Sequence, residues 1–243
     1  MFVQNHWDSE AENWITWART PGFDSYWFYR EVFFHEVVPA PQGATLEIGC
    51  GEGRVARDLA QRGHWVIGVD SSAKLVHKAA EADQRSGYIQ ADVNALPFQK
   101  ATFSLVVAYN CLMDVDDMPA ALAEASRVLR PEGRLAVCVT HPMNDAGQFV
   151  DARPDSQFVI SGAYLGARRH FNQTFRRGGR EIRLRCWCYP LETYLRALED
   201  AGFAIERLRE PAANDESVKH FGESNLRRRR IPVFLMFRAL KLR

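Results

Sequence analysis

The stretch that most constrains the fold of this chain is LEIGCGEGR, residues 46–54. Its apolar start predicts a buried strand, and three glycines at alternate positions follow, Gly49, Gly51 and Gly53. Glycine has no Cβ, so the backbone can bend sharply there and a ligand can approach it closely. Apolar residues then recur at helical spacing, which predicts that the turn opens a helix. The free N–H groups of such a helix start suit a carboxylate or a phosphate.

The next apolar run, residues 65–69, ends in Asp70. An acidic residue at the tip of a second strand is placed to accept hydrogen bonds from ribose hydroxyls. The dinucleotide fingerprint G-x-G-x-x-G needs a glycine at position 54, where Arg54 stands. The sequence therefore predicts a nucleoside-binding crevice, and an NAD-dependent oxidoreductase is the least favoured interpretation.

Glu47 ahead of the glycines completes a pattern, E-x-G-x-G-x-G, that resembles the first motif of the class I S-adenosylmethionine-dependent methyltransferases of the small-molecule, UbiE-like type. The resemblance continues in chain order through Asp70, QADV at 90–93, FSLVVAYN at 103–110 and the segment 123–134 before a fifth strand. It covers residues 42–141 closely and the remainder of the chain in outline. The resemblance implies an α/β fold, a Rossmann-like doubly wound seven-stranded sheet in the order 3-2-1-4-5-7-6.

The alternation of apolar segments independently predicts a parallel sheet with helices on both faces. We expect strands at 44–48, 65–70, 87–90, 103–109, 134–140, 203–209 and 231–240, with helices at 53–62, 72–82, 118–130 and 190–201. The polar segment 211–230 is expected to be a mobile loop.

Four parts are expected along the chain. Residues 1–40 are rich in aromatic side chains and predict an N-terminal helical lid, and 41–140 predict the S-adenosylmethionine-binding α/β core. Residues 141–189 form an insertion in which Gly178-Gly179 separates two extended segments, a hairpin signal. We expect this insertion to be a small antiparallel cap, and 190–243 to complete the core sheet.

The resemblance implies that the cofactor is S-adenosylmethionine. The three glycines would pack against its methionine part, Glu47 would fix the turn, and Asp70 would hold the ribose hydroxyls. Ser71 would border the adenine, Asp92 and the N–H of Val93 would bind its edge, and Asn110 would lie near the methionine amino group. The expected cofactor residues are Glu47, Gly49, Cys50, Gly51, Gly53, Asp70, Ser71, Asp92, Val93 and Asn110.

His141 follows the fifth predicted strand, at the sheet edge where the cofactor would lie, and is the candidate catalytic base. A structural role, capping the strand end, is an equal alternative. Tyr109, at the tip of the fourth strand, is a candidate substrate contact, with core packing as its alternative. The expected substrate residues are Tyr26, Tyr29, Tyr109, His141, Tyr164 and His170.

Arginines cluster in the insertion, within 168–185, and again at 227–230. A solvated face is the default interpretation. The functional alternative is that some of them point inward and hold an anionic acceptor such as a carboxylate or a phosphate.

Bulk properties set limits on partners. A net charge of +1 over 243 residues is too small to attract the chain electrostatically to nucleic acid or to an anionic membrane. Five cysteines at irregular spacing argue against a disulfide framework, and none of them forms a zinc-type pair, so no metal site is predicted. The first residues lack the basic start and apolar core typical of a signal peptide, and no apolar run reaches the ~20 residues of a membrane span, so we expect neither. We expect a soluble cytoplasmic protein.

The sequence predicts methyl transfer from S-adenosylmethionine to a small-molecule acceptor, with aromatic or anionic groups favoured. One alternative is an RNA or protein methyltransferase that uses the arginine-rich cap, although the near-zero charge makes nucleic acid the less favoured partner. Another is a cofactor-binding protein of this fold that transfers no methyl group. The acceptor atom stays open, and so does the choice between a monomer and a homodimer.

Overall fold

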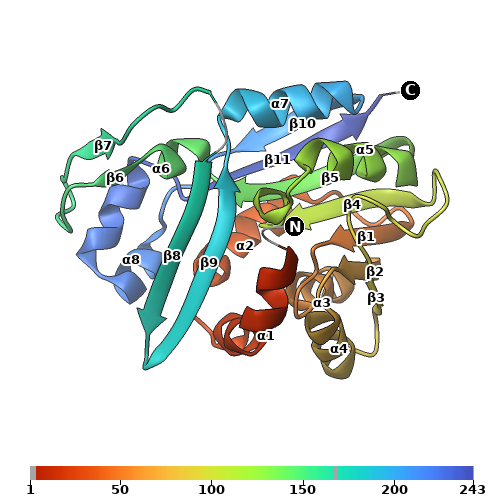
Figure 1. The fold of residues 1–243 in the computed structure, drawn as a ribbon, viewed down its shortest axis with the longest axis horizontal. Helices are drawn as coiled ribbons and strands as arrows, with labels where there is room; N and C mark the ends of the chain where they lie inside the picture. The colour runs from red at the N-terminus through yellow and green to blue at the C-terminus, as the bar shows by residue number, and fades with distance from the viewer. Residues whose placement is uncertain (1–3, 167–168, 243) are drawn as a thin grey trace.

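A seven-stranded sheet runs through the centre of the computed structural model, which describes residues 4–166 and 169–242 (Figure 1). Its order is β10-β11-β5-β4-β1-β2-β3, which confirms the 3-2-1-4-5-7-6 arrangement, with β11 and β10 as the seventh and sixth strands. β1 to β5 are parallel, and β11 runs antiparallel to both of its neighbours. The strands are β1 (Ala44–Ile48), β2 (Trp65–Asp70), β3 (Gly87–Gln90), β4 (Phe103–Tyr109), β5 (Leu129–Thr140), β10 (Phe203–Arg209) and β11 (Phe234–Lys241).

The crossover helices are α3 (Arg54–Gln61), α4 (Ala73–Ala82), α5 (Met118–Val128) and α7 (Leu191–Asp200). Side-chain caps fix two of their starts: the Ser72 hydroxyl accepts the N–H of Leu75, and the Asp117 carboxylate accepts the N–H of Ala120. Such caps satisfy donors that a helix start otherwise leaves free.

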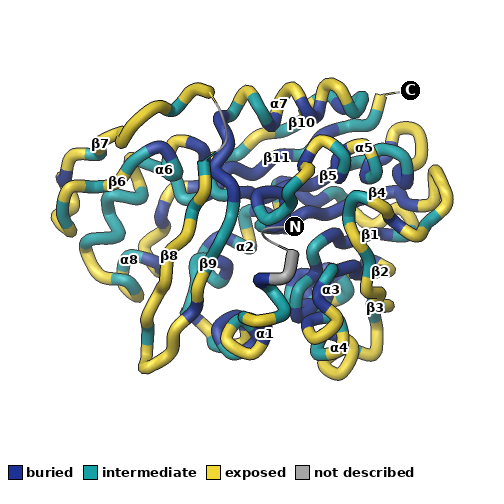
Figure 2. The backbone as a smooth tube through the Cα atoms, viewed as in Figure 1, coloured by how far each residue is buried: buried dark blue, intermediate teal, exposed yellow. Residues whose placement is uncertain are grey.

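β4 is buried along its whole length, and its successive side chains pack into two hydrophobic cores, one on each face of the sheet. Val106 packs with residues of α5 and α7, whereas Val107 packs with Leu59 of α3 and with the N-terminal aromatic residues. Side chains alternate across a strand, so this sheet is covered on both faces. Figure 2 shows the resulting buried strands beneath a mostly exposed outer layer.

The region before β1 is helical, as predicted. It contains α1 (Gln4–Arg19), α2 (Tyr26–Val32) and a π-helix, η1 (Phe33–Val37). Phe33 and Tyr29 are buried against the sheet.

The insertion after β5 contains the predicted hairpin, β8 (Arg169–Arg177) paired with β9 (Arg180–Cys188). Its turn is Gly178-Gly179, with φ of +55° and +72°, which glycine adopts at no steric cost. A short helix, α6 (Pro142–Ala146), and a second pair of strands, β6 (Gly147–Phe149) and β7 (Phe158–Ile160), precede the hairpin. The hairpin lies against α1, where a His6 ring nitrogen is 2.8 Å from the Arg183 carbonyl oxygen (Figure 1).

The expectation of a mobile loop over 211–230 is wrong. This segment forms α8 (Asp215–Phe221) and a 3₁₀ helix, η3 (Glu223–Arg229). The Asn214 side chain caps α8 by accepting the Ser217 N–H at 2.8 Å, and the Phe221 ring packs 4.9 Å from that of Phe28. Helices this short carry too few apolar residues to produce a periodic signal, so they were not predicted from the sequence.

Several boundaries also differ from the prediction, most of all at the start of β5. β5 begins at Leu129 rather than at 134, and α5 accordingly ends at Val128. A register shift opposite Phe103 and a positive φ of +62° at Glu132 accommodate the extra residues. Within the described residues, none of the helices has the length and apolar character needed to cross a bilayer.

Candidate functional site

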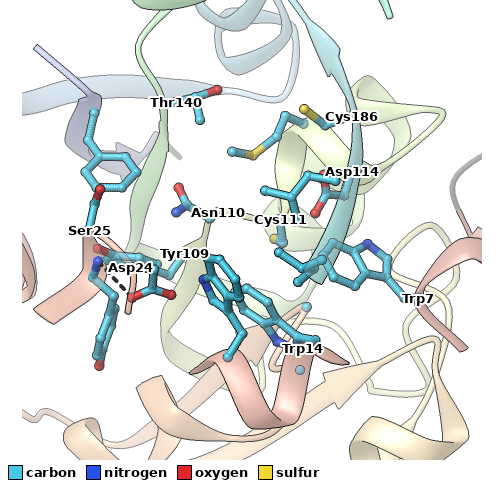
Figure 3. Close-up of a pocket in the computed structure, with 18 of the residues that line it drawn as sticks. Trp7, Trp14, Asp24, Ser25, Tyr109, Asn110, Cys111, Asp114, Thr140 and Cys186 are labelled. Carbon is cyan, nitrogen blue, oxygen red and sulfur yellow. Dashed lines mark hydrogen bonds between the residues drawn. The ribbon is translucent and has the colours of Figure 1, made fainter. Parts of the chain in front are cut away.

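A cavity of about 750 Å³ lies at the carboxyl ends of β1, β2 and β4 (Figure 3). The α1 and α2 region, the β8–β9 hairpin and η3 complete its wall. Parallel α/β sheets place ligands at this edge, where neighbouring crossovers diverge. Residues of the wall include Trp7, Trp14, Tyr26, Tyr29, Glu47, Gly49, Cys50, Gly51, Asp70, Ser71, Asp92, Val93, Tyr109, Asn110, Asp114, Thr140, Phe171, Arg177, Cys186, Arg227, Arg228 and Phe234.

The three glycines of the β1–α3 turn all have positive φ, between +54° and +84°. A Cβ on Gly49 would overlap that of Cys111, and one on Gly53 would lie 2.8 Å from the Tyr88 hydroxyl. Gly51 instead borders the cavity, where an added Cβ would approach Nε1 of Trp14 to 3.3 Å. Gly49 and Gly53 therefore allow neighbouring side chains to pack closely against the turn, and Gly51 leaves space at the cavity wall. Gly53 does not line the cavity.

Asp70, at the end of β2, holds this turn in place. One carboxylate oxygen accepts the Gly51 N–H at 2.8 Å, and the other accepts the Ser72 N–H at 2.9 Å. Burial raises the pKa of the carboxyl, and the two N–H donors oppose that shift. A carboxylate has about four acceptor positions, so each oxygen keeps capacity for a ligand hydroxyl.

Glu47, at the end of β1, is 1% exposed and lines the same wall. Burial raises the pKa of its carboxyl well above the usual range, and the charge of Asp70 adds to the effect. Within residues 4–166 and 169–242, its Oε2 has no hydrogen-bond partner. A buried oxygen of this kind is a potential contact for a bound molecule.

The remaining predicted cofactor residues also reach the cavity. Ser71, Asp92 and Val93 follow β2 and β3, and a carboxylate oxygen of Asp92 accepts the Asn94 N–H at 2.9 Å. Asn110 has φ of +51° just beyond β4, and Figure 3 shows it between Thr140 and Tyr109. The structure therefore brings together every predicted cofactor residue except Gly53.

Three of the predicted substrate tyrosines line the cavity. The Tyr26 and Tyr109 rings meet edge to face, 5.3 Å apart, and the Tyr26 hydroxyl donates to Asp58. The hydroxyls of Tyr29 and Tyr109 are buried, and neither has a hydrogen-bond partner in the described part of the chain.

The other three predicted residues lie outside the cavity wall. Nδ1 of His141 accepts the Met143 N–H at 3.0 Å, which caps α6, and Nε2 lies 2.7 Å from a carboxylate oxygen of Glu210. The Tyr164 hydroxyl accepts the Leu191 N–H, and the His170 ring packs 3.8 Å from that of Trp187. Catalysis by His141 stays a prediction, and its contacts favour the capping alternative.

Sequence reasoning missed two parts of the wall. Asp114 follows Cys111 in the 3₁₀ turn η2 (Leu112–Asp114), and burial raises the pKa of its carboxyl well above the usual range. Arg54 forms a 2.7 Å ion pair with Asp24 and lies over the Trp14 ring. The place of Arg54 directly after the glycine motif was the available signal, whereas nothing in the sequence marked Asp114.

Comparison with known proteins agrees with this geometry. Residues 46–137 match the model of a family described as methyltransferase domain. Residues 46–137 are therefore similar to the methyltransferase domain of class I, S-adenosylmethionine-dependent enzymes.

Curated relatives match about half of this chain. The chain is 35% identical over 122 residues to malonyl-[acyl-carrier protein] O-methyltransferase of Enterobacter lignolyticus, a match covering 48% of this chain and 49% of that protein. It is 33% identical over 144 residues to 2-phytyl-1,4-naphtoquinone methyltransferase of Nostoc punctiforme, covering 54% and 63%. In the Enterobacter relative and others like it, the match spans half of the length or less.

The similarity in fold extends over more of the chain. A crystal structure of an S-adenosylmethionine-dependent methyltransferase from Mesorhizobium loti superposes with a TM-score of 0.69 at 23% identity, covering 89% of this chain and 98% of that one. The regions around the core sheet therefore also follow a known architecture.

Proposed function

We propose that this protein transfers a methyl group from S-adenosylmethionine to a small-molecule acceptor. The observation that carries the proposal is the pairing of Asp70 with the Gly51 turn at one end of a cavity that continues beyond it to Arg228. One end then holds a nucleoside, and the other is left for an acceptor. The name of the Enterobacter relative gives malonyl-[acyl-carrier protein] as its substrate, and that of the Nostoc relative gives a phytyl naphthoquinone.

The residues present fit the cofactor. The turn at Gly51 has no side chain to fill the wall, Asp70 keeps acceptor capacity for ribose hydroxyls, and Glu47 offers an unpartnered oxygen. The cavity lies within the roughly 300–1,000 Å³ range of small-molecule pockets. When bound, S-adenosylmethionine supplies an electrophilic methyl group, so the cofactor carries the difficult chemistry.

The protein's own contribution is positioning and the exclusion of water. The rings of Trp7, Trp14 and Phe234 line the cavity, as does Asn110. Holding two reactants in line can contribute about 7–11 kcal/mol to lowering a barrier. Aromatic rings beside a cationic sulfur are also favourable.

An acceptor that must lose a proton needs a base within reach. Two half-buried carboxyl groups line the cavity outside the glycine turn, Asp114 and Asp145, and desolvation raises the pKa of both. These carboxyls are better placed for this role than His141. We also propose a cytoplasmic location, the four-part division of the chain given above, and either a monomer or a homodimer as the working assembly.

Isothermal titration calorimetry with S-adenosylmethionine and S-adenosylhomocysteine tests the proposal. Wild type should bind both, and Asp70→Asn should weaken binding by about 10-fold to 100-fold, because hydrogen bonds to charged groups contribute about 1.5–3 kcal/mol. Asp200→Asn, an exposed carboxylate at the end of α7, is the control. Absence of binding in wild type, or equal binding by wild type and Asp70→Asn, would overturn the assignment.

A further inference from the structure

Two neighbouring arginines, Arg227 and Arg228 of η3, line the cavity away from the glycine turn. Their guanidinium carbons lie 5.2 and 5.4 Å from the centre of one ring, that of Phe149. Two cations on the same ring are close enough to repel each other, and they are half-buried, where water screens the repulsion less.

The hydrogen bonds of this pair go to neutral oxygens. Arg227 donates to the carbonyl of Asp151, and Arg228 donates to the side-chain oxygen of Asn144. Among residues 4–166 and 169–242, no carboxylate forms an ion pair with either guanidinium. The adjacent Arg229, in contrast, is paired with Asp215 at the surface. Neutral acceptors fix the orientation of the pair and leave its charge uncompensated.

Polar donors near the pair are also unused. Nε of Arg227 and the hydroxyl of Tyr29 are buried, and the described part of the chain gives neither a partner. Tyr29 lines the cavity and is close enough for the charge of Arg228 to act on it. A buried donor without a partner is unfavourable, and a bound oxyanion would satisfy it.

The charge of the Asp145 carboxyl group acts on Arg228. The contacts of Asp145 explain why it does not neutralise the two arginines. Its oxygens accept from the Thr140 hydroxyl at 2.7 Å and from the Asn144 amide at 3.2 Å. Burial also raises the pKa of Asp145, which disfavours its charged form.

We propose that Arg227, Arg228 and the hydroxyl of Tyr29 bind a carboxylate of the methyl acceptor. The planar guanidinium matches a carboxylate in two parallel hydrogen bonds. The same cavity is lined by the rings of Phe171 and Phe234, which suit an apolar body. The acceptor is therefore an organic acid with an apolar body, and its carboxylate serves as the recognition handle. This inference rests on the proposed function and names its substrate class.

The test is a thermal-shift screen of the full chain saturated with S-adenosylhomocysteine. The probes are aromatic and aliphatic monocarboxylic acids, each paired with its own primary amide, together with phenyl phosphate and benzyl phosphate. Acids should stabilise the protein and their amides should not. Stabilisation by amides as strong as by acids, by the phosphates alone, or by none of the probes would overturn the carboxylate site.

Variants then locate the site by titration calorimetry with the best acid. Arg228→Gln and Arg227→Gln should each weaken it about tenfold or more, as expected for loss of a charge-assisted bond, and should keep the affinity for S-adenosylhomocysteine. Arg229→Gln, in the same helix but paired at the surface, should bind the acid as wild type does. Equal weakening by all three would indicate general charge attraction and refute the site. Loss of S-adenosylhomocysteine binding in wild type would instead refute the proposed function.

Discussion

Gly49→Ala tests the reasoning about the β1–α3 turn most directly. The position has φ of +67°, which costs an L-residue about 1–2 kcal/mol. The new Cβ would overlap the Cβ of Cys111 and lie 3.1 Å from its Sγ, and neither atom can move far in a buried site. Overpacking of this kind costs about 1–3 kcal/mol. The expected loss is about 2–5 kcal/mol, a large share of the roughly 5–15 kcal/mol that holds a domain folded.

The matched control is Gly202→Ala. Its φ is +78°, and no atom lies within 4 Å of the Cβ that would be added. It should therefore lose only the conformational part, about 1–2 kcal/mol. Urea denaturation followed by tryptophan fluorescence measures both losses from the shift in midpoint at constant slope.

A double-mutant cycle separates the steric part further. Cys111→Gly removes the overlapping atoms and leaves its Cα at 3.8 Å, an ordinary contact. Combined with Gly49→Ala, it should recover about 1–3 kcal/mol relative to additivity. Cys111→Ala keeps the Cβ and should rescue much less. A loss of stability in Gly49→Ala no larger than that in Gly202→Ala would refute the steric overlap. Simple additivity of Gly49→Ala and Cys111→Gly would refute it too.

Three further predictions concern charged groups at the cavity. Asp24→Asn should destabilise the protein by about 3 kcal/mol, the low end of the cost of breaking a buried pair, because it leaves the Arg54 guanidinium without its partner in a part-buried site. Urea denaturation should show that Asp24→Asn combined with Arg54→Met recovers part of this loss, and equal losses in the single and the double variant would contradict the explanation. Burial raises the pKa of Asp114, so the folded state holds this proton more tightly than the unfolded state does. The stability that this difference contributes is fully present below the unfolded pKa of about 3.9 and is lost as pH rises through the higher folded pKa. Asp114→Asn should therefore gain stability relative to wild type on going from pH 4 to pH 8, and a difference that stays constant with pH would exclude this. His141→Ala should lose about 1 kcal/mol with its cap and keep both cofactor affinity and kcat; a selective fall in kcat would instead establish it as the base.

The core of the fold was predictable because its signals are local. Buried strands, the glycine turn and capped helices each leave a pattern within a few residues, as in LEIGCGEG and in the Ser72 cap. Asp70 and the glycine turn could be placed at one edge in advance because adjacent parallel strands end there, whereas the hydrogen bond between Asp70 and Gly51 was not predicted.

The acceptor end of the cavity was much less predictable. Its wall joins segments far apart in the sequence, such as Tyr29 with Arg228, and no local pattern encodes such contacts. His141 illustrates the limit. Its position after β5 was read correctly, but the direction of its side chain depends on Glu210 and on the Met143 N–H, which only the folded arrangement supplies.

The contact between α1 and the β8–β9 hairpin, here called the seam, affects how molecules can reach the cavity. The hydrogen bonds across it are isolated, such as the one between a His6 ring nitrogen and the Arg183 carbonyl and the one from the Arg183 N–H to the Glu10 carboxylate, whereas the sheet below is a continuous ladder of strands. Local opening is cheapest where few buried contacts break. We therefore expect solutes to enter and leave where this seam opens, while the sheet beneath it stays closed.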